Sequence, residues 1–183
     1  MAVIYMVRHG RATAGWDTDP DPGLDELGGN QARAMATKLG PLGPLALVSS
    51  PLRRCRETAQ VLAIPWNMSA TLEPNVAEIP SPEGVAMAQR VDWLRTAMTS
   101  TWTQLGPRYT AFRDGVASFL LSLSADTVIC SHFVAINAAI GAATGTDAVL
   151  TRSLDNCSIT VFEVQSGTLD LVDAGHEADT LIR

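Results

Sequence analysis

Short apolar segments rich in β-forming residues alternate with longer helical segments along this chain. Residues 2–7, 45–48 and 126–130 are the clearest of these segments, and a helical pattern follows each of them before the next begins. Nearly continuous apolar runs of this length are typical of strands buried on both faces of a parallel sheet. The alternation therefore predicts an α/β fold, a three-layer α/β/α sandwich with a mostly parallel central sheet.

The helical segments carry recognisable start and stop signals. Asp25 is the expected N-cap of a helix that ends at Leu39, before Gly40 and Pro41. Pro51 follows two serines and suits the first position of a helix. The expected helices span 25–39, 51–63, 84–105, 108–123 and 133–143, with a short strand near 70–73 and a hairpin formed by 159–164 and 168–172.

Length and composition narrow the class of protein. The 183 residues correspond to one domain, so we expect a single domain over 1–183, with 65–110 as its cap or substrate-specificity segment. Hydrophobic residues make up 46% of the chain and charged residues 17%, which excludes a disordered chain. The formal net charge of −6 argues against a general nucleic-acid-binding protein, since such proteins carry a basic excess.

The cysteines and the apolar stretches indicate the cellular compartment of the protein. Three widely spaced cysteines without a Cys-x-x-Cys pair argue against a disulfide scaffold or a structural zinc site. No apolar stretch approaches the roughly 18 residues of a membrane-spanning helix, and residues 1–7 lack the pattern of a signal peptide. We therefore expect a cytoplasmic protein that has neither a membrane nor a nucleic acid as its partner.

Polar residues follow three of the predicted strands. Arg8, His9 and Gly10 end the first, two serines end the second, and Ser131 and His132 end the third. Because the carboxyl ends of parallel strands meet at one edge of a sheet, these side chains are expected to lie close together. Arginines from two segments and the N–H groups of helix N-termini add further donors. Such a set suits a tetrahedral oxyanion, and phosphate fits best.

These segments together resemble the histidine phosphatase superfamily, the phosphoglycerate mutase-like enzymes. Residues 8–10 resemble the family's Arg-His-Gly signature, and 50–59 are similar to its S-x-L-x-R-A-x-Q-T-A element. The other similar elements are the helix start at Leu24–Gly28 with Gln31 and Ala32, the second histidine at Ser131-His132, and the late N-x-S element at Asn156 and Ser158. They occur in the family's order from the first strand to about residue 164.

The resemblance implies phosphoryl transfer through a phosphohistidine on His9, with neither a metal nor another cofactor. Arg8 and Arg54 would hold the phosphoryl oxygens and lower the pKa of His9, and His132 would donate to another oxygen as an imidazolium. Glu78 is the expected proton donor. The chain departs from the family pattern directly after it, so Glu83 stays open as an alternative donor. The residues expected to bind substrate are Gly10, Arg11, Ser131, Phe133 and Asn156.

The function implied by the resemblance is that of a phosphatase acting on a small phosphomonoester or on a phosphorylated protein. The Arg-His-Gly-x-Ala form of residues 8–12 resembles a phosphatase subset. Two alternatives remain open: a phosphoglycerate-type mutase, although such mutases are longer in the cap region, and a non-catalytic phospholigand-binding module that regulates phosphoproteins. Substrate specificity is expected in the 11–23 loop and in 65–110. Neither the substrate nor the oligomeric state is indicated.

Overall fold

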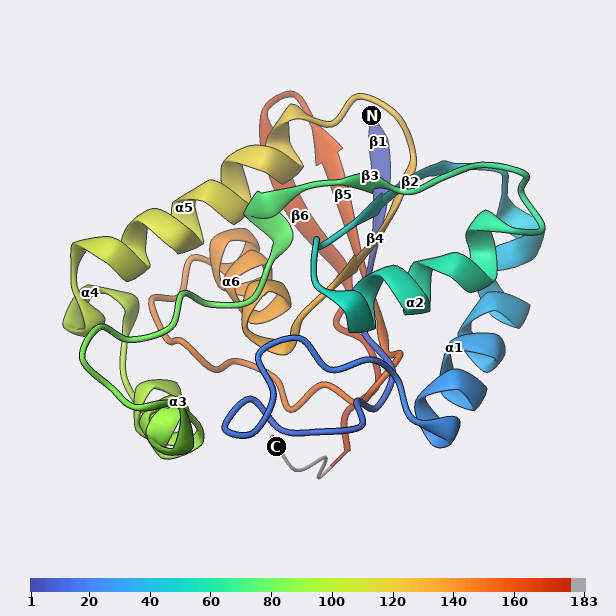
Figure 1. Ribbon diagram of the computed structural model, residues 1–183. Helices are drawn as coiled ribbons and strands as arrows, with labels where there is room; N and C mark the ends of the chain where they lie inside the picture. Colours follow the sequence, from blue (N-terminus) through green and yellow to red (C-terminus); the bar gives the residue numbers. More distant parts are fainter. Residues whose placement is uncertain (179–183) are drawn as a thin grey trace.

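The central sheet of the protein has six strands. The computed structural model describes residues 1–178, and its strands lie in the order β3-β2-β4-β1-β5-β6 (Figure 1). They span Ala2–Arg8 (β1), Ala46–Ser49 (β2), Thr71–Leu72 (β3), Thr127–Ser131 (β4), Ile159–Gln165 (β5) and Thr168–Asp173 (β6). The first four strands in this order pair in parallel, whereas β5 and β6 pair antiparallel. The sheet is mixed, and the three predicted strand ends lie in its parallel part.

Helices cover both faces of this sheet. They span Glu26–Leu39 (α1), Arg53–Ala63 (α2), Arg90–Met98 (α3), Trp102–Leu105 (α4), Pro107–Ser122 (α5) and Phe133–Thr144 (α6), with 3₁₀ turns at Gly40–Leu42, Pro74–Val76 and Met87–Gln89. Figure 1 shows α1 and α2 on one side of the sheet and α4, α5 and α6 on the other. The layered α/β fold expected from the alternation of segments is confirmed.

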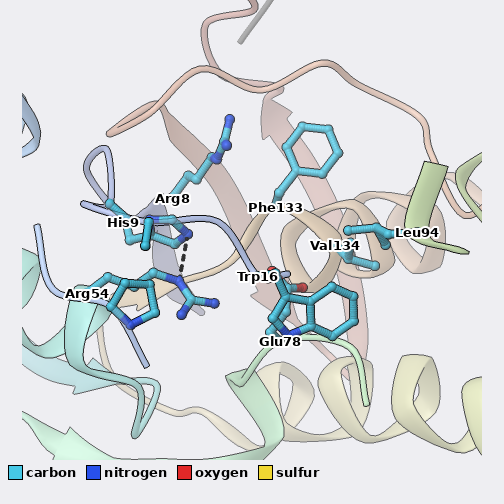
Figure 2. A pocket seen from close by; sticks show the side chains of 11 residues that line it. Arg8, His9, Trp16, Arg54, Glu78, Leu94, Phe133 and Val134 are labelled. Carbon is cyan, nitrogen blue, oxygen red and sulfur yellow. Dashed lines mark hydrogen bonds between the residues drawn. The ribbon is translucent and has the colours of Figure 1, made fainter. Parts of the chain in front are cut away.

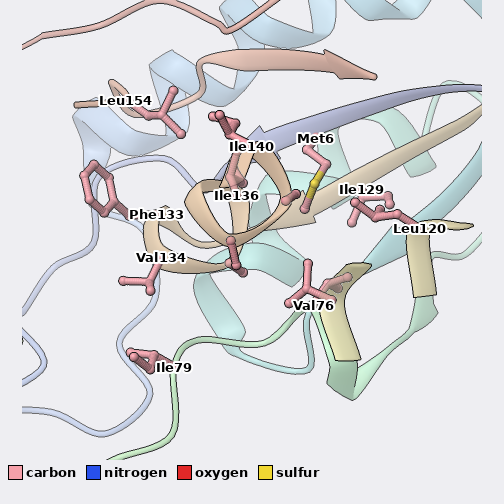
Figure 3. Close-up of a cluster of buried hydrophobic side chains, with 14 of the residues drawn as sticks. Met6, Val76, Ile79, Leu120, Ile129, Phe133, Val134, Ile136, Ile140 and Leu154 are labelled. Carbon is pink, nitrogen blue, oxygen red and sulfur yellow. The ribbon is translucent and has the colours of Figure 1, made fainter. Parts of the chain in front are cut away.

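Two apolar clusters form the core, one on each face of the sheet. Ile4 and Met6 of β1 and Ile129 of β4 pack against α5 and α6, as Figure 3 shows for Met6 and Ile129. On the other face Val128 and Cys130 of β4 pack with side chains of α1 and α2. Successive residues of β4 thus face opposite sides, as the two-residue period of a strand requires. Both faces are apolar, which explains the continuous apolar runs in the sequence.

The helix boundaries mostly follow the sequence signals. Asp25 caps α1, because its carboxylate accepts a hydrogen bond of 2.7 Å from the Gly28 N–H. The expected start of the next helix at Pro51 is wrong, since α2 begins at Arg53. The Ser50 hydroxyl accepts from the Leu52 N–H over 3.2 Å, and Leu52 is extended. Residues 50–52 therefore form the turn that joins β2 to α2.

The single helix expected over 84–105 is also wrong, because this segment is broken into a 3₁₀ turn, α3 and α4. Thr101 begins a new helix through a capping box with Gln104. The Trp102 N–H donates to the Asp147 carbonyl over 2.9 Å, and the Trp102 side chain is fully buried. The bend between α3 and α4 thus places this tryptophan in the core. Among residues 1–178, no helix is both long and apolar enough to cross a membrane.

Candidate active site

The ends of β1, β2 and β4 bring the predicted site residues together. Arg8 is the register partner of Ser131 in the parallel pair β1–β4. One residue further on, the His9 N–H donates to the Ser131 carbonyl over 3.0 Å, and the Ser50 N–H donates to the Cys130 carbonyl over 2.9 Å. The polar residues that follow three strands therefore meet at one edge of the sheet, as expected for parallel strands.

Hydrogen bonds to both ring nitrogens fix the tautomer of His9. Arg54 Nε lies 3.2 Å from His9 Nε2, and since a guanidinium only donates, Nε2 must be the acceptor. His9 Nδ1 lies 2.8 Å from the Gly10 carbonyl oxygen, so it carries the proton and donates. Burial, followed by the charges of Arg54 and Arg8, holds the pKa of His9 well below its ordinary value. His9 is therefore neutral, with the lone pair of a nucleophile on Nε2.

The second histidine is neutral as well. His132 is fully buried, and its Nδ1 accepts from Arg54 Nη2 over 3.1 Å. Its Nε2 lies 2.8 Å from the Ser50 hydroxyl and is the protonated nitrogen in this tautomer. Burial, then the charge of Arg54, the His9 ring and the charge of Arg8, lower the pKa of His132 well below its ordinary value. In this arrangement Nδ1 accepts a hydrogen bond, so the imidazolium expected to donate to a phosphoryl oxygen stays a prediction.

Two buried arginines supply the positive charge of the site. Arg54 lies in the first turn of α2 and bridges the two histidine rings, whose centroids are 5.2 Å apart. Arg8 ends β1, donates from Nη1 to the Leu154 carbonyl over 2.6 Å, and holds its guanidinium 5.0 Å from the centroid of the Phe133 ring. Burial lowers the pKa of Arg8 to about 10, so it stays charged at neutral pH.

Glu78 lies at the same site, and its environment favours the protonated acid. Its side chain is 13% exposed, and Oε2 lies 3.6 Å from His132 Nδ1. Burial raises the pKa of Glu78 above its ordinary value, although the charges of Arg54 and Arg8 act in the opposite direction. The alternative acid, Glu83, has a side chain that is 88% exposed and paired with Arg108 over 2.7 Å. Of the two carboxyl groups, the structure brings only Glu78 to the histidines.

A pocket of about 60 Å³ opens beside these groups (Figure 2). Its lining residues are Arg8, His9, Ala12, Ala14, Trp16, Pro22, Arg54, Glu78, Leu94, Phe133 and Val134. Figure 2 shows His9 and Arg54 on one side of this pocket and Leu94 and Val134 on the other. Both charged and apolar side chains thus line the pocket.

The remaining residues expected to bind substrate divide into two groups. Phe133 lines the pocket, whereas Gly10, Arg11, Ser131 and Asn156 are not among its lining residues. Asn156 donates from Nδ2 to the His9 carbonyl over 2.9 Å, and the Ser131 hydroxyl donates to the Val76 carbonyl over 2.7 Å. Arg11 pairs with Asp25. These residues support the segments that carry His9 and Glu78.

Backbone packing explains why glycine stands at position 10. A Cβ atom on Gly10 would lie 2.4 Å from the Gly28 carbonyl oxygen, and one on Gly28 would lie 2.1 Å from the Arg11 carbonyl oxygen. The loop after β1 therefore rests directly on the backbone of α1. The Gly10 N–H also donates to the Thr58 hydroxyl of α2 over 3.1 Å. The loop that carries His9 is thus held by both helices on this side of the sheet.

Reasoning from the sequence missed several contributors to the site. The hydroxyl of Ser50 accepts from His132 Nε2, and Thr58 anchors Gly10; both lie within the 50–59 element but were assigned no role. Trp16 forms part of the apolar wall. A large aromatic residue within an Asp-, Pro- and Gly-rich loop is the signal that points to it. Leu94 and Val134 carry no comparable signal, since apolar residues on helices are usually core residues.

Comparison with known proteins decides the family. The sequence model of the histidine phosphatase superfamily (branch 1) matches residues 4–176. The chain belongs to this superfamily. The Escherichia fergusonii protein named "Probable phosphoglycerate mutase GpmB" is 26% identical over an alignment of 189 residues. The alignment covers 90% of this chain and 86% of that protein. The resemblance predicted from the strand-end motifs is therefore confirmed.

Solved structures of this superfamily share the fold. The mycobacterial glucosyl-3-phosphoglycerate phosphatase in complex with VO3 is 25% identical, with a TM-score of 0.71 over 93% of this chain and 97% of that one. Bacillus stearothermophilus YhfR is 19% identical, with a TM-score of 0.79 over 97% of this chain and 98% of that one. The phosphoglycerate mutase-like α/β fold is thus established. Within residues 1–178, no group of three or more His, Cys, Asp or Glu side chains is placed to hold a metal ion.

Proposed function

We propose that this member of the histidine phosphatase superfamily is a phosphatase that hydrolyses a small phosphomonoester through a phosphohistidine on His9, using its own side chains and no metal or other cofactor. The observation that carries the proposal is the hydrogen bond from Arg54 to His9 Nε2, which assigns the lone pair of a neutral ring to Nε2 at a pocket that Glu78 also lines. Hydrolysis of a phosphomonoester through a covalent intermediate requires a nucleophile and an acid at one pocket.

The first step transfers the phosphoryl group to the enzyme. His9 Nε2 attacks phosphorus, a P–N bond forms, and the P–O bond to the alcohol breaks. The electron pair of that bond goes to the alcohol oxygen, which takes the proton of Glu78. The free alcohol leaves, and the enzyme holds phosphohistidine and the Glu78 carboxylate. Burial raises the pKa of Glu78, which favours the protonated form that this step uses.

The second step returns the enzyme to its starting state. A water molecule attacks phosphorus while the Glu78 carboxylate accepts one of its protons. The P–N bond breaks, its electron pair returns to His9 Nε2, and inorganic phosphate leaves. Glu78 therefore acts first as an acid and then as a base.

The arginines stabilise the charge that spreads over the phosphoryl oxygens in both steps. Arg54 is within 3.2 Å of the attacking nitrogen, so its N–H groups lie where the oxygens of the transferred group arrive. The dianionic group would offset the two arginine charges and raise the pKa of His132, whose Nδ1 could then take a proton and donate to an oxygen. The imidazolium form of His132 belongs, in this proposal, to the phosphate-bound state alone.

Phosphate release from an aryl phosphate in the presence of a chelator tests the proposal. We expect turnover that vanadate inhibits, and a loss of at least about a thousandfold in kcat for His9→Ala. Undiminished turnover by that variant would contradict a role for His9 as nucleophile. Stoichiometric phosphate binding without turnover by the unaltered protein would instead favour the phospholigand-binding alternative.

A phosphoglycerate-type mutase is the second candidate, and the relatives named probable phosphoglycerate mutases are the observation that favours it. A mutase returns the phosphoryl group to another hydroxyl of the same substrate. Incubation with 3-phosphoglycerate separates the two candidates, since a mutase forms the isomeric ester and a phosphatase releases phosphate. We expect no isomeric ester.

A further inference from the structure

Few of the side chains that line the pocket are ionisable. Among the described residues that line it, the ionisable side chains are Arg8, His9, Arg54 and Glu78. The proposed reaction uses all four: one as nucleophile, one as acid, and two for the phosphoryl oxygens. The lining offers no further lysine, arginine or histidine to a second anionic group on the alcohol part of a substrate. A carboxylate there would lose its hydration without a partner, at a substantial cost in free energy.

The rest of the lining is apolar. Phe133 packs against Arg8, and the six other side chains are Ala12, Ala14, Trp16, Pro22, Leu94 and Val134. They come from the loop after β1, from α3 and from α6, so three separate parts of the chain contribute to one apolar wall. Removing apolar surface of a ligand from water at such a wall is favourable by roughly 25 cal/mol per Å².

Trp16 is the largest of these side chains, and it is supported from behind by other aromatic rings. The centroids of Trp16 and Trp93 are 6.3 Å apart, and those of Trp93 and Tyr109 are 5.4 Å apart. The guanidinium of Arg90, which is not among the lining residues, lies 6.0 Å from the Trp16 ring centroid. These contacts dock the 12–24 loop on α3, whose Trp93 in turn packs on Tyr109 of α5. They present the indole to the pocket as a fixed surface, on which an aromatic ring of a ligand can stack.

We infer that the substrate is a phosphomonoester of an uncharged, apolar alcohol, with an aromatic or alkyl group that packs on Trp16, Leu94 and Val134. This inference rests on the proposed phosphatase function and adds the class of substrate. Trp16 is then a specificity-determining residue. The acidic alcohol part of a phosphoglycerate fits this wall poorly, whereas a benzyl group fits it well.

Three phosphate esters of primary alcohols test the inference, because their leaving groups have similar basicity. We expect kcat/KM to fall by about tenfold or more at each step from benzyl phosphate to glycerol 1-phosphate to 3-phosphoglycerate, mainly through KM. In Trp16→Ala the kcat/KM for benzyl phosphate, divided by that for glycerol 1-phosphate, should fall about ten- to hundredfold. Trp16→Phe should keep most of this preference. Equal rates for the three esters, or a preference for 3-phosphoglycerate, would overturn the inference.

Trp66→Ala is the matched control. Trp66 packs in the cluster on the other face of the sheet and donates from Nε1 to the Gly40 carbonyl over 3.1 Å. Its loss can reduce the amount of folded protein, but it should leave the ratio of the two esters unchanged. A fall of that ratio in Trp66→Ala as large as in Trp16→Ala would show a general loss of structure and would count against Trp16 as the specificity residue.

Binding of phosphonates separates the inference from the proposed function. Calorimetry with benzylphosphonate and 3-phosphonopropionate needs no turnover, and we expect the benzyl compound to bind at least about tenfold more tightly, a preference that Trp16→Ala removes. If this preference is present but no ester releases phosphate, the apolar site stands and the phosphatase proposal fails. If esters are hydrolysed but the preference is absent, the phosphatase proposal stands and the inference fails.

Discussion

Arg54 donates from Nε to the Nε2 atom of His9 over 3.2 Å, so the charge of the arginine and the basicity of the histidine are directly coupled. The same guanidinium donates from Nη2 to His132 over 3.1 Å. One side chain therefore keeps both rings in the tautomers described and disfavours protonation of either. In the proposed reaction, Arg54 thus sets the tautomer of the nucleophile before it contacts any phosphoryl oxygen.

Replacing Arg54 by methionine keeps much of the bulk of the side chain but removes the charge and the donors. We expect Arg54→Met to lower kcat/KM by about a hundredfold to a thousandfold, because donors to the phosphoryl oxygens are lost. The pKa of His9 should rise toward its ordinary value, since the largest opposing charge is gone. Neutral His9 is the active form, so the acid limb of the pH profile of kcat/KM should move to higher pH.

The matched control is the neighbouring arginine on the same helix. Arg53 is exposed and pairs with Glu57 over 2.7 Å. Exposed ion pairs contribute little to stability, because water and salt screen them. Arg53→Met should change kcat/KM by less than about twofold and leave the pH profile in place. An equal loss in both variants would show that α2, rather than the guanidinium of Arg54, is what the reaction needs.

Removing the acid should affect poor leaving groups most. Glu78→Gln cannot protonate the alcohol, so we expect kcat for benzyl phosphate to fall by about a hundredfold or more and kcat for 4-nitrophenyl phosphate to fall far less. In the unaltered enzyme kcat/KM should fall as pH rises through the raised pKa of Glu78, because the carboxylate has no proton to give. That alkaline limb should be absent in Glu78→Gln.

Glu83→Gln serves as the control for this experiment. Its carboxylate is exposed and lies outside the pocket, so both esters should be hydrolysed at the unaltered rate. A loss selective for benzyl phosphate in Glu83→Gln, with none in Glu78→Gln, would reverse the assignment of the acid.

Replacement of two adjacent glycines of α1 by alanine should change the stability in opposite directions. A Cβ on Gly28 would lie 2.1 Å from the Arg11 carbonyl oxygen, whereas one on Gly29 would meet only the end of the Arg33 side chain, at 3.6 Å. We expect Gly28→Ala to lower the free energy of unfolding by about 1–3 kcal/mol, since backbone must shift. Gly29→Ala should raise it by up to about 1 kcal/mol through helix propensity. Urea denaturation measures both, and equal effects would contradict the close contact of the His9 loop with α1.

The sequence predicts the catalytic side of the site because its residues follow strand ends. Parallel strands bring Arg8, His9 and His132 to one sheet edge whatever the intervening helices do. The capping signal at Asp25 is a local effect, and the cap appears in the structure as expected. These predictions succeed because each depends on the backbone near the residue concerned.

The apolar side of the site depends on contacts between distant segments, and the sequence does not reveal it. Trp16, Leu94 and Val134 meet only through the docking of a loop and two helices. The break between α3 and α4 was missed because the apolar spacing of 84–105 fits one helix, while the burial of Trp102 requires two. The lowered pKa of His132 depends first on its burial, which no sequence pattern records.

The proposed reaction passes through a covalent phosphoryl group on His9. The most direct measurement mixes the protein with benzyl phosphate, quenches the reaction in alkali, where phosphohistidine survives, and locates the phosphoryl group on peptides by mass spectrometry. We predict one phosphoryl group on the peptide that contains His9, formed at the rate of alcohol release and absent in His9→Ala. A protein that releases phosphate with no labelled His9, or with the group on another residue, would contradict the account.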